Sequence, residues 1–230
     1  MTAAVPETIH ARAVVFDLDG TLLDTLADLG ESMNEVIAAA GFPPHPLGAY
    51  RRFVGDGVRN LASRALPAGV RNETTIDRCV DEMRRVYGAR WDRKTLPYAG
   101  VTELLDQLTR RRLPLAVLSN KPHDLTTMVV AQLLPRWSFA AVVGQRVGRP
   151  RKPDPTSALE IAADLGVDSG SCVYVGDTDT DMKTAERAGM FAVGACWGFR
   201  DAAELEASGA RALIRHPREL LELLEPVATP

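Results

Sequence analysis

The stretch Val14-Val15-Phe16-Asp17-Leu18-Asp19-Gly20-Thr21-Leu22-Leu23-Asp24-Thr25 decides the fold of this chain. It begins as an apolar run with β-branched and aromatic members, which is typical of a short buried strand. It ends at two acids one residue apart, Asp17 and Asp19, whose side chains can leave an extended backbone on the same face. Because two carboxylates this close repel each other, they indicate a site with a cation or a basic side chain between them.

Further short apolar runs follow, each alternating with a helical pattern. They are predicted to form strands at residues 113–118, 140–143, 172–175, 191–195 and 212–214. Alternating strands and helices imply an α/β fold, a Rossmann-like parallel sheet with helices on both faces. Ligands of such sheets bind at the carboxyl ends of the strands, which is where Asp17 emerges.

Residues 26–93 show helical spacing without a strand pattern, so they are predicted to form a separate all-α unit inserted after the first strand. Its first helix is expected to start at Thr25, with Asp28 three residues later completing a capping-box-like start. Further helices are expected at 58–66 and 72–91. The predicted domains are therefore an α/β core of residues 1–24 and 95–230 and a helical cap domain of residues 25–94.

Composition narrows the class of protein. A length of 230 residues with 46% hydrophobic and 25% charged residues suits one large or two small globular domains. The net charge of −3 gives no reason to expect nucleic-acid or anionic-membrane partners. Three cysteines without metal-ligand spacing, no signal-peptide pattern in residues 1–10 and no membrane-length apolar run favour the cytoplasm. A monomer or a homodimer is expected.

Asp-x-Asp-Gly-Thr-Leu-x-Asp-Thr after a hydrophobic strand resembles the first motif of the haloacid dehalogenase superfamily of phosphatases. Three further stretches resemble the later motifs of that superfamily, in the same order. They are Leu-Ser-Asn-Lys-Pro around Ser119, Lys152 followed by Pro-Asp-Pro, and Gly-Asp-x-x-x-Asp at residues 176–181. The resemblance extends over nearly the whole chain, because the helical insertion matches the cap that these enzymes carry between their first and second motifs.

The resemblance implies a role for each acid and for the threonine between them. Asp17 would attack phosphorus and form an aspartyl-phosphate. Asp19 would act as general acid and then general base, and its main-chain carbonyl would bind a metal together with Asp17 and Asp177. Thr21 would orient the two acids by hydrogen bonding. Asp181 would orient a metal-bound water or Lys152. Few, hard carboxylate ligands suit Mg²⁺, whereas the scattered histidines do not suit zinc.

The remaining core residues would meet the phosphate. The Ser119 hydroxyl can donate to a phosphoryl oxygen, and Asn120 would supply backbone contacts. The role of Lys121 stays open between a supporting and a solvated side chain. Lys152 would neutralise charge on the nucleophile and the phosphate. Its rarity favours that role, because most of the 27 basic residues are arginines, whereas Arg149 and Arg151 beside it are expected to be solvated.

Several functions remain open at this point. Dehalogenases of the superfamily lack the second acid and the metal, and its sugar-phosphate mutases usually carry an apolar residue at the position of Thr21, so a phosphatase is favoured over both. A non-catalytic binding module is the alternative from another class. The partner expected of a phosphatase is a small phosphorylated metabolite.

Three stretches resemble phosphoglycolate phosphatases in particular: residues 23–29, 54–58 and 97–101. The residues expected to bind substrate in the cap are Gly55 and Gly57, which give a loop the freedom to approach a ligand, and Arg52 and Arg59, which could meet a carboxylate. Asp56 in the same loop is unexpected beside an anionic substrate. A pyrophosphatase or a nucleotide or sugar-phosphate phosphatase is the nearest alternative.

Overall fold

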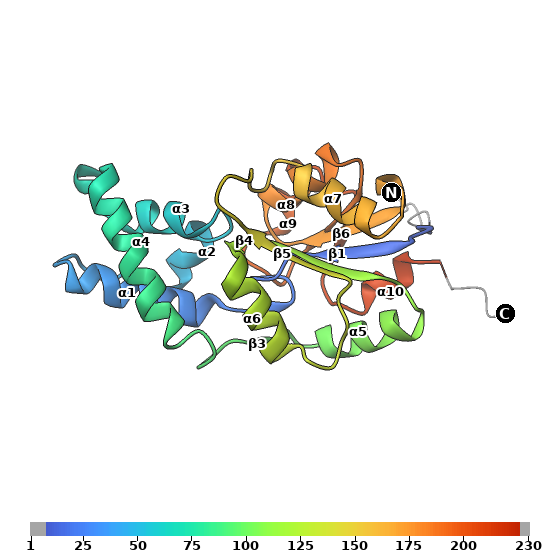
Figure 1. The fold of residues 1–230 in the computed structure, drawn as a ribbon, viewed down its shortest axis with the longest axis horizontal. Coiled ribbons are helices and arrows are strands. Elements are labelled where there is room, and N and C mark those ends of the chain that lie inside the picture. The colour runs from blue at the N-terminus through green and yellow to red at the C-terminus, as the bar shows by residue number, and fades with distance from the viewer. Residues whose placement is uncertain (1–7, 226–230) are drawn as a thin grey trace.

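Six strands form one parallel sheet in the computed structural model, which describes residues 8–225 (Figure 1). The strand order is β5-β4-β1-β6-β7-β8. The strands are β1 (Ala13–Phe16), β4 (Leu115–Pro122), β5 (Ala141–Gln145), β6 (Cys172–Gly176), β7 (Phe191–Ala195) and β8 (Ala212–Ile214). Every neighbouring pair runs parallel, so the α/β fold expected from the sequence is confirmed. Residues 1–7 and 226–230 of the predicted core domain, and the leader pattern considered there, lie outside the described residues.

Helices cover both faces of this sheet. They are α5 (Val101–Arg110), α6 (His123–Leu133), α7 (Thr156–Asp164), α8 (Asp179–Arg187), α9 (Ala202–Ala207) and α10 (Glu219–Leu223), with a 3₁₀ turn at Ser169–Ser171. Figure 1 shows α7, α8 and α9 on one side and α5, α6 and α10 on the other.

The central strand β1 explains why both faces are covered. Val14 and Phe16 pack into the hydrophobic cluster that contains the inward faces of α5, α6 and α10. Ala13 and Val15 point the opposite way, into the cluster that contains α7, α8 and α9. All four residues are buried, and successive side chains of a strand alternate between faces. A strand covered on both faces therefore reads as a continuous apolar run.

A helical insertion (residues 25–94) separates β1 from the rest of the sheet. Its elements are α1 (Leu26–Ala39), α2 (Tyr50–Phe53), α3 (Val58–Ala65) and α4 (Glu73–Gly88), with 3₁₀ turns at Leu47–Ala49 and Ala68–Val70. They lie together beyond the carboxyl ends of the strands (Figure 1). The exact domain boundaries at residues 25 and 94 stay a prediction.

The two connections of the insertion lie side by side. β2 (Leu23–Asp24) enters it and pairs antiparallel with β3 (Leu96–Pro97), which leaves it. The sequence did not predict this ribbon, because two residues a strand carry no recognisable pattern.

The expected capping role of Asp28 is wrong. The Thr25 side chain makes no capping hydrogen bond, and Asp28 is fully buried. Its Oδ2 instead accepts hydrogen bonds from the Lys94 and Thr95 backbone N–H groups and from the Thr95 hydroxyl, each at 2.8 Å. A carboxylate that receives three donors holds the exit of the insertion against its first helix. None of the described helices is long and apolar enough to cross a bilayer.

Candidate active site

The loop after β1 carries the first acids at the carboxyl edge of the sheet. Asp17 is buried and accepts a hydrogen bond from the Leu18 backbone N–H at 2.7 Å. Gly20 has a φ of +93°, and a Cβ at this position would collide with the Asp177 carboxylate. Glycine is therefore required twice here, by the backbone conformation and by the approach of the loop after β6.

Three buried carboxylates meet at this edge. Asp17, Asp177 and Asp181 each offer an oxygen within 4.8 Å of the others, and this group can hold a metal ion. Burial, and then the charge of Asp181, raises the pKa of Asp17 to about 7, against the opposing effect of Lys152. Burial, and then the charges of Asp181 and Asp17, raise the pKa of Asp177 well above its usual value. Such shifts mark a site with too little positive charge, which a bound cation would supply.

Lys152 provides the positive charge that the protein itself brings to this cluster. Its ammonium lies 2.9 Å from Asp17 Oδ1 and 2.7 Å from Asp181 Oδ1, and it donates to the Leu118 carbonyl at 3.0 Å. Burial alone would lower the pKa of Lys152, but the two carboxylates hold it well above its usual value. Arg149, three residues earlier, is exposed and paired with Glu160. Lys152 and Arg149 therefore differ in their place in the fold, because Lys152 is buried among carboxylates and Arg149 is exposed.

Thr21 has a different partner from the one expected. Its hydroxyl donates to Asp177 Oδ1 at 2.7 Å, and the other Asp177 oxygen accepts from the Phe199 backbone N–H at 2.8 Å. Thr21 thus fixes the orientation of Asp177 across the site; it does not bridge Asp17 and Asp19. Each Asp177 oxygen keeps a second lone pair for a metal.

Asp181 lies in the first turn of α8 and is committed to protein contacts. One oxygen accepts from Lys152, and the other accepts from the Thr178 N–H and hydroxyl at 3.0 and 2.6 Å. The contact from the Thr178 N–H, together with the Asp181 N–H donating to the Thr178 hydroxyl, forms the capping box that starts α8. Although Asp181 belongs to the group of three carboxylates, it is oriented toward Lys152.

Lys121, left open by the sequence, is buried and reaches the second acid. Its ammonium donates to Asp19 Oδ1 at 2.8 Å and to the hydroxyl of Tyr87, on α4, at 2.9 Å. The Asp19 carboxylate therefore points toward Lys121. The Asp19 atom that the family resemblance assigns to the metal is a different one, the main-chain carbonyl oxygen. Tyr87 was not predicted, because an aromatic residue on an amphipathic helix normally indicates only core packing.

Ser119 and Asn120 follow directly at the carboxyl end of β4. The Ser119 hydroxyl accepts a hydrogen bond from the Lys121 N–H at 3.3 Å, and none of the described residues accepts its own proton, which can therefore be donated to a ligand. The Asn120 amide donates to the Lys152 carbonyl at 3.1 Å and to the Gly55 carbonyl at 3.2 Å. Asn120 thus connects the lysine loop with the loop of the insertion.

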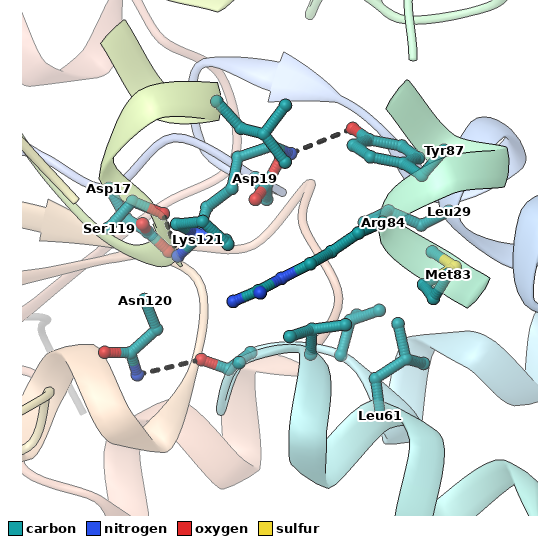
Figure 2. Close-up of a pocket in the computed structure, with 16 residues that line it drawn as sticks. Asp17, Asp19, Leu29, Leu61, Met83, Arg84, Tyr87, Ser119, Asn120 and Lys121 are labelled. Atoms are coloured by element: carbon teal, nitrogen blue, oxygen red, sulfur yellow. Dashed lines mark hydrogen bonds and ion pairs between the residues drawn. The ribbon is translucent and has the colours of Figure 1, made fainter. Parts of the chain in front are cut away.

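A pocket lies between the strand ends and the insertion (Figure 2). Its sheet side includes Asp17, Asp19, Ser119, Asn120 and Lys121. Its other side includes Gly55 and Gly57, as expected, together with mainly apolar side chains of α1, α3 and α4.

Asp56 is turned away from the pocket. Thr180 donates to its Oδ1 at 2.6 Å, and Arg64 pairs with the other oxygen. Burial opposes ionisation, but these two partners lower the pKa of Asp56 below its usual value. The acid in this loop therefore fastens the insertion to α8 and is compatible with an anionic ligand in the pocket.

The two arginines expected to bind substrate do not line the pocket. Arg52 is exposed and pairs with Glu204 at 2.6 Å. Arg59 pairs with Glu73 and Asp77 on the outer surface of the insertion. The prediction relied on the closeness of both arginines in sequence to Gly55 and Gly57. In the structure, both side chains point toward their acidic partners instead. The arginine that does line the pocket is Arg84, on α4 (Figure 2).

Comparisons with known proteins agree with this geometry. The family model for haloacid dehalogenase-like hydrolases matches residues 14–195. A phosphoglycolate phosphatase of Pseudomonas putida is 30% identical over 213 residues, which cover 91% of this chain and 78% of the relative. A phosphoglycolate phosphatase of Mesorhizobium japonicum is 35% identical over 190 residues, covering 82% and 84%.

A solved structure from Lactobacillus delbrueckii subsp. bulgaricus has the same fold. It superposes with a TM-score of 0.88 at 30% identity and covers 94% of this chain and 99% of that chain. The fold, the order of the motifs and the sequence relatives agree. The chain therefore belongs to the haloacid dehalogenase-like hydrolases and is a phosphatase of that family.

Proposed function

We propose that this enzyme hydrolyses small phosphate monoesters in a Mg²⁺-dependent reaction through an aspartyl-phosphate, with 2-phosphoglycolate as the first substrate to test. The observation that carries the proposal is the buried Asp17 carboxylate, which lies 2.9 Å from Lys152 and lines a pocket beside Ser119. The names of the Pseudomonas putida and Mesorhizobium japonicum relatives support the choice of substrate.

In the first half-reaction, an oxygen of Asp17 attacks phosphorus from the side opposite the leaving alcohol. The bond between phosphorus and the ester oxygen breaks as the new bond to Asp17 forms. Asp19 gives its proton to the departing oxygen, so that a neutral alcohol leaves. The Ser119 hydroxyl and the Lys152 ammonium are available to hold the phosphoryl oxygens during transfer.

In the second half-reaction, Asp19 works as a base. Its carboxylate accepts a proton from water while the water oxygen attacks phosphorus. The bond between phosphorus and Asp17 breaks, inorganic phosphate forms, and both acids return to their starting states. The Lys121 ammonium, 2.8 Å from Asp19, keeps this carboxyl at the wall of the pocket throughout.

Asp17 and Asp177 offer carboxylate oxygens to Mg²⁺, and Asp19 would add its main-chain carbonyl. Support for this fit comes from the raised pKa values of both carboxyls, because a cation relieves the repulsion that raises them. When bound, the ion neutralises charge on the phosphoryl oxygens and helps to orient them. Hard oxygen ligands with room for water and phosphate suit Mg²⁺ best.

Phosphate release tests the reaction and its metal requirement. The purified protein is stripped with a chelator and assayed on 2-phosphoglycolate, p-nitrophenyl phosphate, a hexose phosphate, a nucleoside monophosphate and pyrophosphate. We expect activity to disappear on chelation and to return with Mg²⁺. Full activity of the chelated protein would contradict the metal requirement. Release of phosphate from pyrophosphate alone would contradict the proposed substrate class and indicate a pyrophosphatase.

Variants of the two acids test the intermediate. Asp17→Asn should lose essentially all turnover and form no phosphoenzyme. Asp19→Asn should accumulate phosphoenzyme from p-nitrophenyl phosphate, whose leaving group needs no proton, and the intact mass of the protein detects it. Asp24→Asn is the control, because Asp24 is an exposed acid of the same sequence motif, at the end of β2. Equal, substantial turnover in the Asp17 and Asp19 variants would disprove these roles.

A further inference from the structure

We propose that Arg84 recognises a carboxylate on the alcohol part of the substrate and thereby selects short phosphate esters of hydroxy acids. The inference rests on the proposed phosphatase function, because it assigns the far side of the same pocket. Arg84 belongs to α4 of the helical insertion and lines the pocket with Asp17 and Ser119, which belong to the sheet. Figure 2 shows its side chain extended from the helix into the pocket, with the guanidinium leading.

In the described part of the chain, the guanidinium of Arg84 differs from its neighbours in its contacts. Within residues 8–225, no hydrogen bond or ion pair joins Arg84 to another group, and the close-up shows none. Its neighbour Arg85 pairs with Glu82 at 2.5 Å, and Arg64 of the same insertion pairs with Asp56. A guanidinium is a planar fork of donors that matches both oxygens of a carboxylate. Arg84 therefore keeps this recognition surface for a ligand.

The other cations of the site already have acidic partners. Lys152 contacts Asp17 at 2.9 Å, and Lys121 contacts Asp19 at 2.8 Å. Both contact the acids at the strand ends, where the phosphoryl group would react, and Lys121 also lines the pocket. A second negative charge, carried on the alcohol side of the substrate, would therefore find its counterpart in Arg84.

The surroundings of Arg84 favour a single charged contact over many weak ones. The insertion also lines the pocket with Leu29, Val58, Leu61 and Met83. These side chains offer no hydrogen bonds to the hydroxyl groups of a sugar, and the hydroxyl of Tyr87, which accepts from Lys121, adds a single donor. Aliphatic walls also exclude water, which strengthens an ion pair between a guanidinium and a carboxylate. A short hydroxy acid ester fits this combination better than a sugar phosphate does.

Matched substrates that differ only in the carboxylate test the proposal. 2-Phosphoglycolate is compared with 2-hydroxyethyl phosphate, and 3-phosphoglycerate with glycerol 3-phosphate, on the wild type, Arg84→Gln and Arg84→Lys. The control is Arg85→Gln, next to Arg84 and paired outside the pocket. Thermal unfolding of each variant is measured alongside, and p-nitrophenyl phosphate reports the basal chemistry.

We expect the wild type to prefer the carboxylate ester of at least one pair. Arg84→Gln should lower kcat/KM for that ester about 10- to 100-fold, mainly through KM, as loss of a charge-assisted contact predicts. It should change the uncharged partner and p-nitrophenyl phosphate less than about threefold, and Arg84→Lys should fall between. Arg85→Gln should match the wild type on every ester.

Other outcomes overturn the proposal in distinguishable ways. Equal losses on both members of a pair would mean that Arg84 binds the phosphoryl group, and no loss would mean that it binds nothing. A wild type without preference for the carboxylate would disprove the substrate class while the phosphatase function stands. A wild type that releases phosphate from no ester would overturn both the proposed function and this inference.

Discussion

At the scale of single residues, Lys152 shows how the surroundings of a side chain determine its role. Its ammonium is buried between the carboxylates of Asp17 and Asp181, and it also donates to the Leu118 carbonyl. A charge buried this deeply is tolerated only where opposite charges and acceptors surround it. The arrangement keeps the lysine protonated and in contact with the proposed nucleophile, so the lysine should affect the rate more than metal binding.

Lys152→Met tests this role, because methionine keeps much of the volume and removes the charge. We expect kcat to fall at least about 100-fold, which is the usual effect of removing a group that stabilises a transition state by its charge. The stabilisation of the protein by Mg²⁺, measured as a shift in Tm, should persist because the carboxylates remain. Arg149→Met, on an exposed arginine of the same loop, is the matched control and should keep full activity. A fully active Lys152→Met enzyme would refute the role.

At the scale of elements, the loop of residues 55–57 joins the insertion to the sheet. Asp56 accepts from Thr180 of α8, and the Asn120 amide donates to the Gly55 carbonyl. Gly57 lies just before α3 with a φ of +84° and a ψ of 165°, a conformation that only glycine adopts without strain. The backbone of this loop therefore forms a wall of the pocket, and the side chains of Asp56 and Asn120 hold the loop in place.

Gly57→Ala should strain this loop by about 1–3 kcal/mol. Because the loop closes the pocket over every substrate, we expect kcat/KM to fall on p-nitrophenyl phosphate as much as on a carboxylate ester. Gly48→Ala is the control, since Gly48 has open space around it and ordinary backbone angles, and it should be neutral. A loss confined to carboxylate esters would instead make the loop itself a specificity element.

At the scale of the whole molecule, the carboxylate cluster couples stability to pH and to metal. Burial raises the pKa of Asp17 from its ordinary value of 3.8 to about 7 in the metal-free protein. Between these values the folded chain holds a proton that the unfolded chain has released. The contribution of Asp17 to stability is therefore present at low pH and is lost as the pH rises to about 7. A cation replaces that proton and competes with it.

Thermal unfolding with and without Mg²⁺ measures this coupling. We expect the rise in Tm caused by Mg²⁺ to be roughly 2–4 °C larger at about pH 8 than at about pH 5.5. In Asp17→Asn, which has no proton to exchange at this position, the difference between the two pH values should shrink. A Tm rise that is the same at both pH values in the wild type would contradict the assignment of Asp17 to the metal site.

The alternation of apolar runs and helical patterns predicted the strands of the sheet, because each strand needs a local sequence that both faces can bury. The spacing of Asp17 and Asp19, and the motifs around Ser119, Lys152 and Asp177, likewise predicted which strand ends carry the polar residues. These features depend on neighbours in the chain, and parallel strands bring their carboxyl ends to one edge whatever the details of packing.

The sequence did not predict which side chains that are distant along the chain pair with one another. Nothing local indicates that Thr21 donates to Asp177, that Asp28 holds Thr95, or that Lys121 reaches Tyr87. Arg52 and Arg84 show the same limit, because the sequence contains acids for either arginine to pair with. Only the packing of the insertion against the sheet decides which charges are neutralised within the protein and which remain for a ligand. The sequence by itself thus determined the fold class and the strand ends that carry the polar residues, whereas the tertiary structure decided how those side chains are oriented and which arginine lines the pocket.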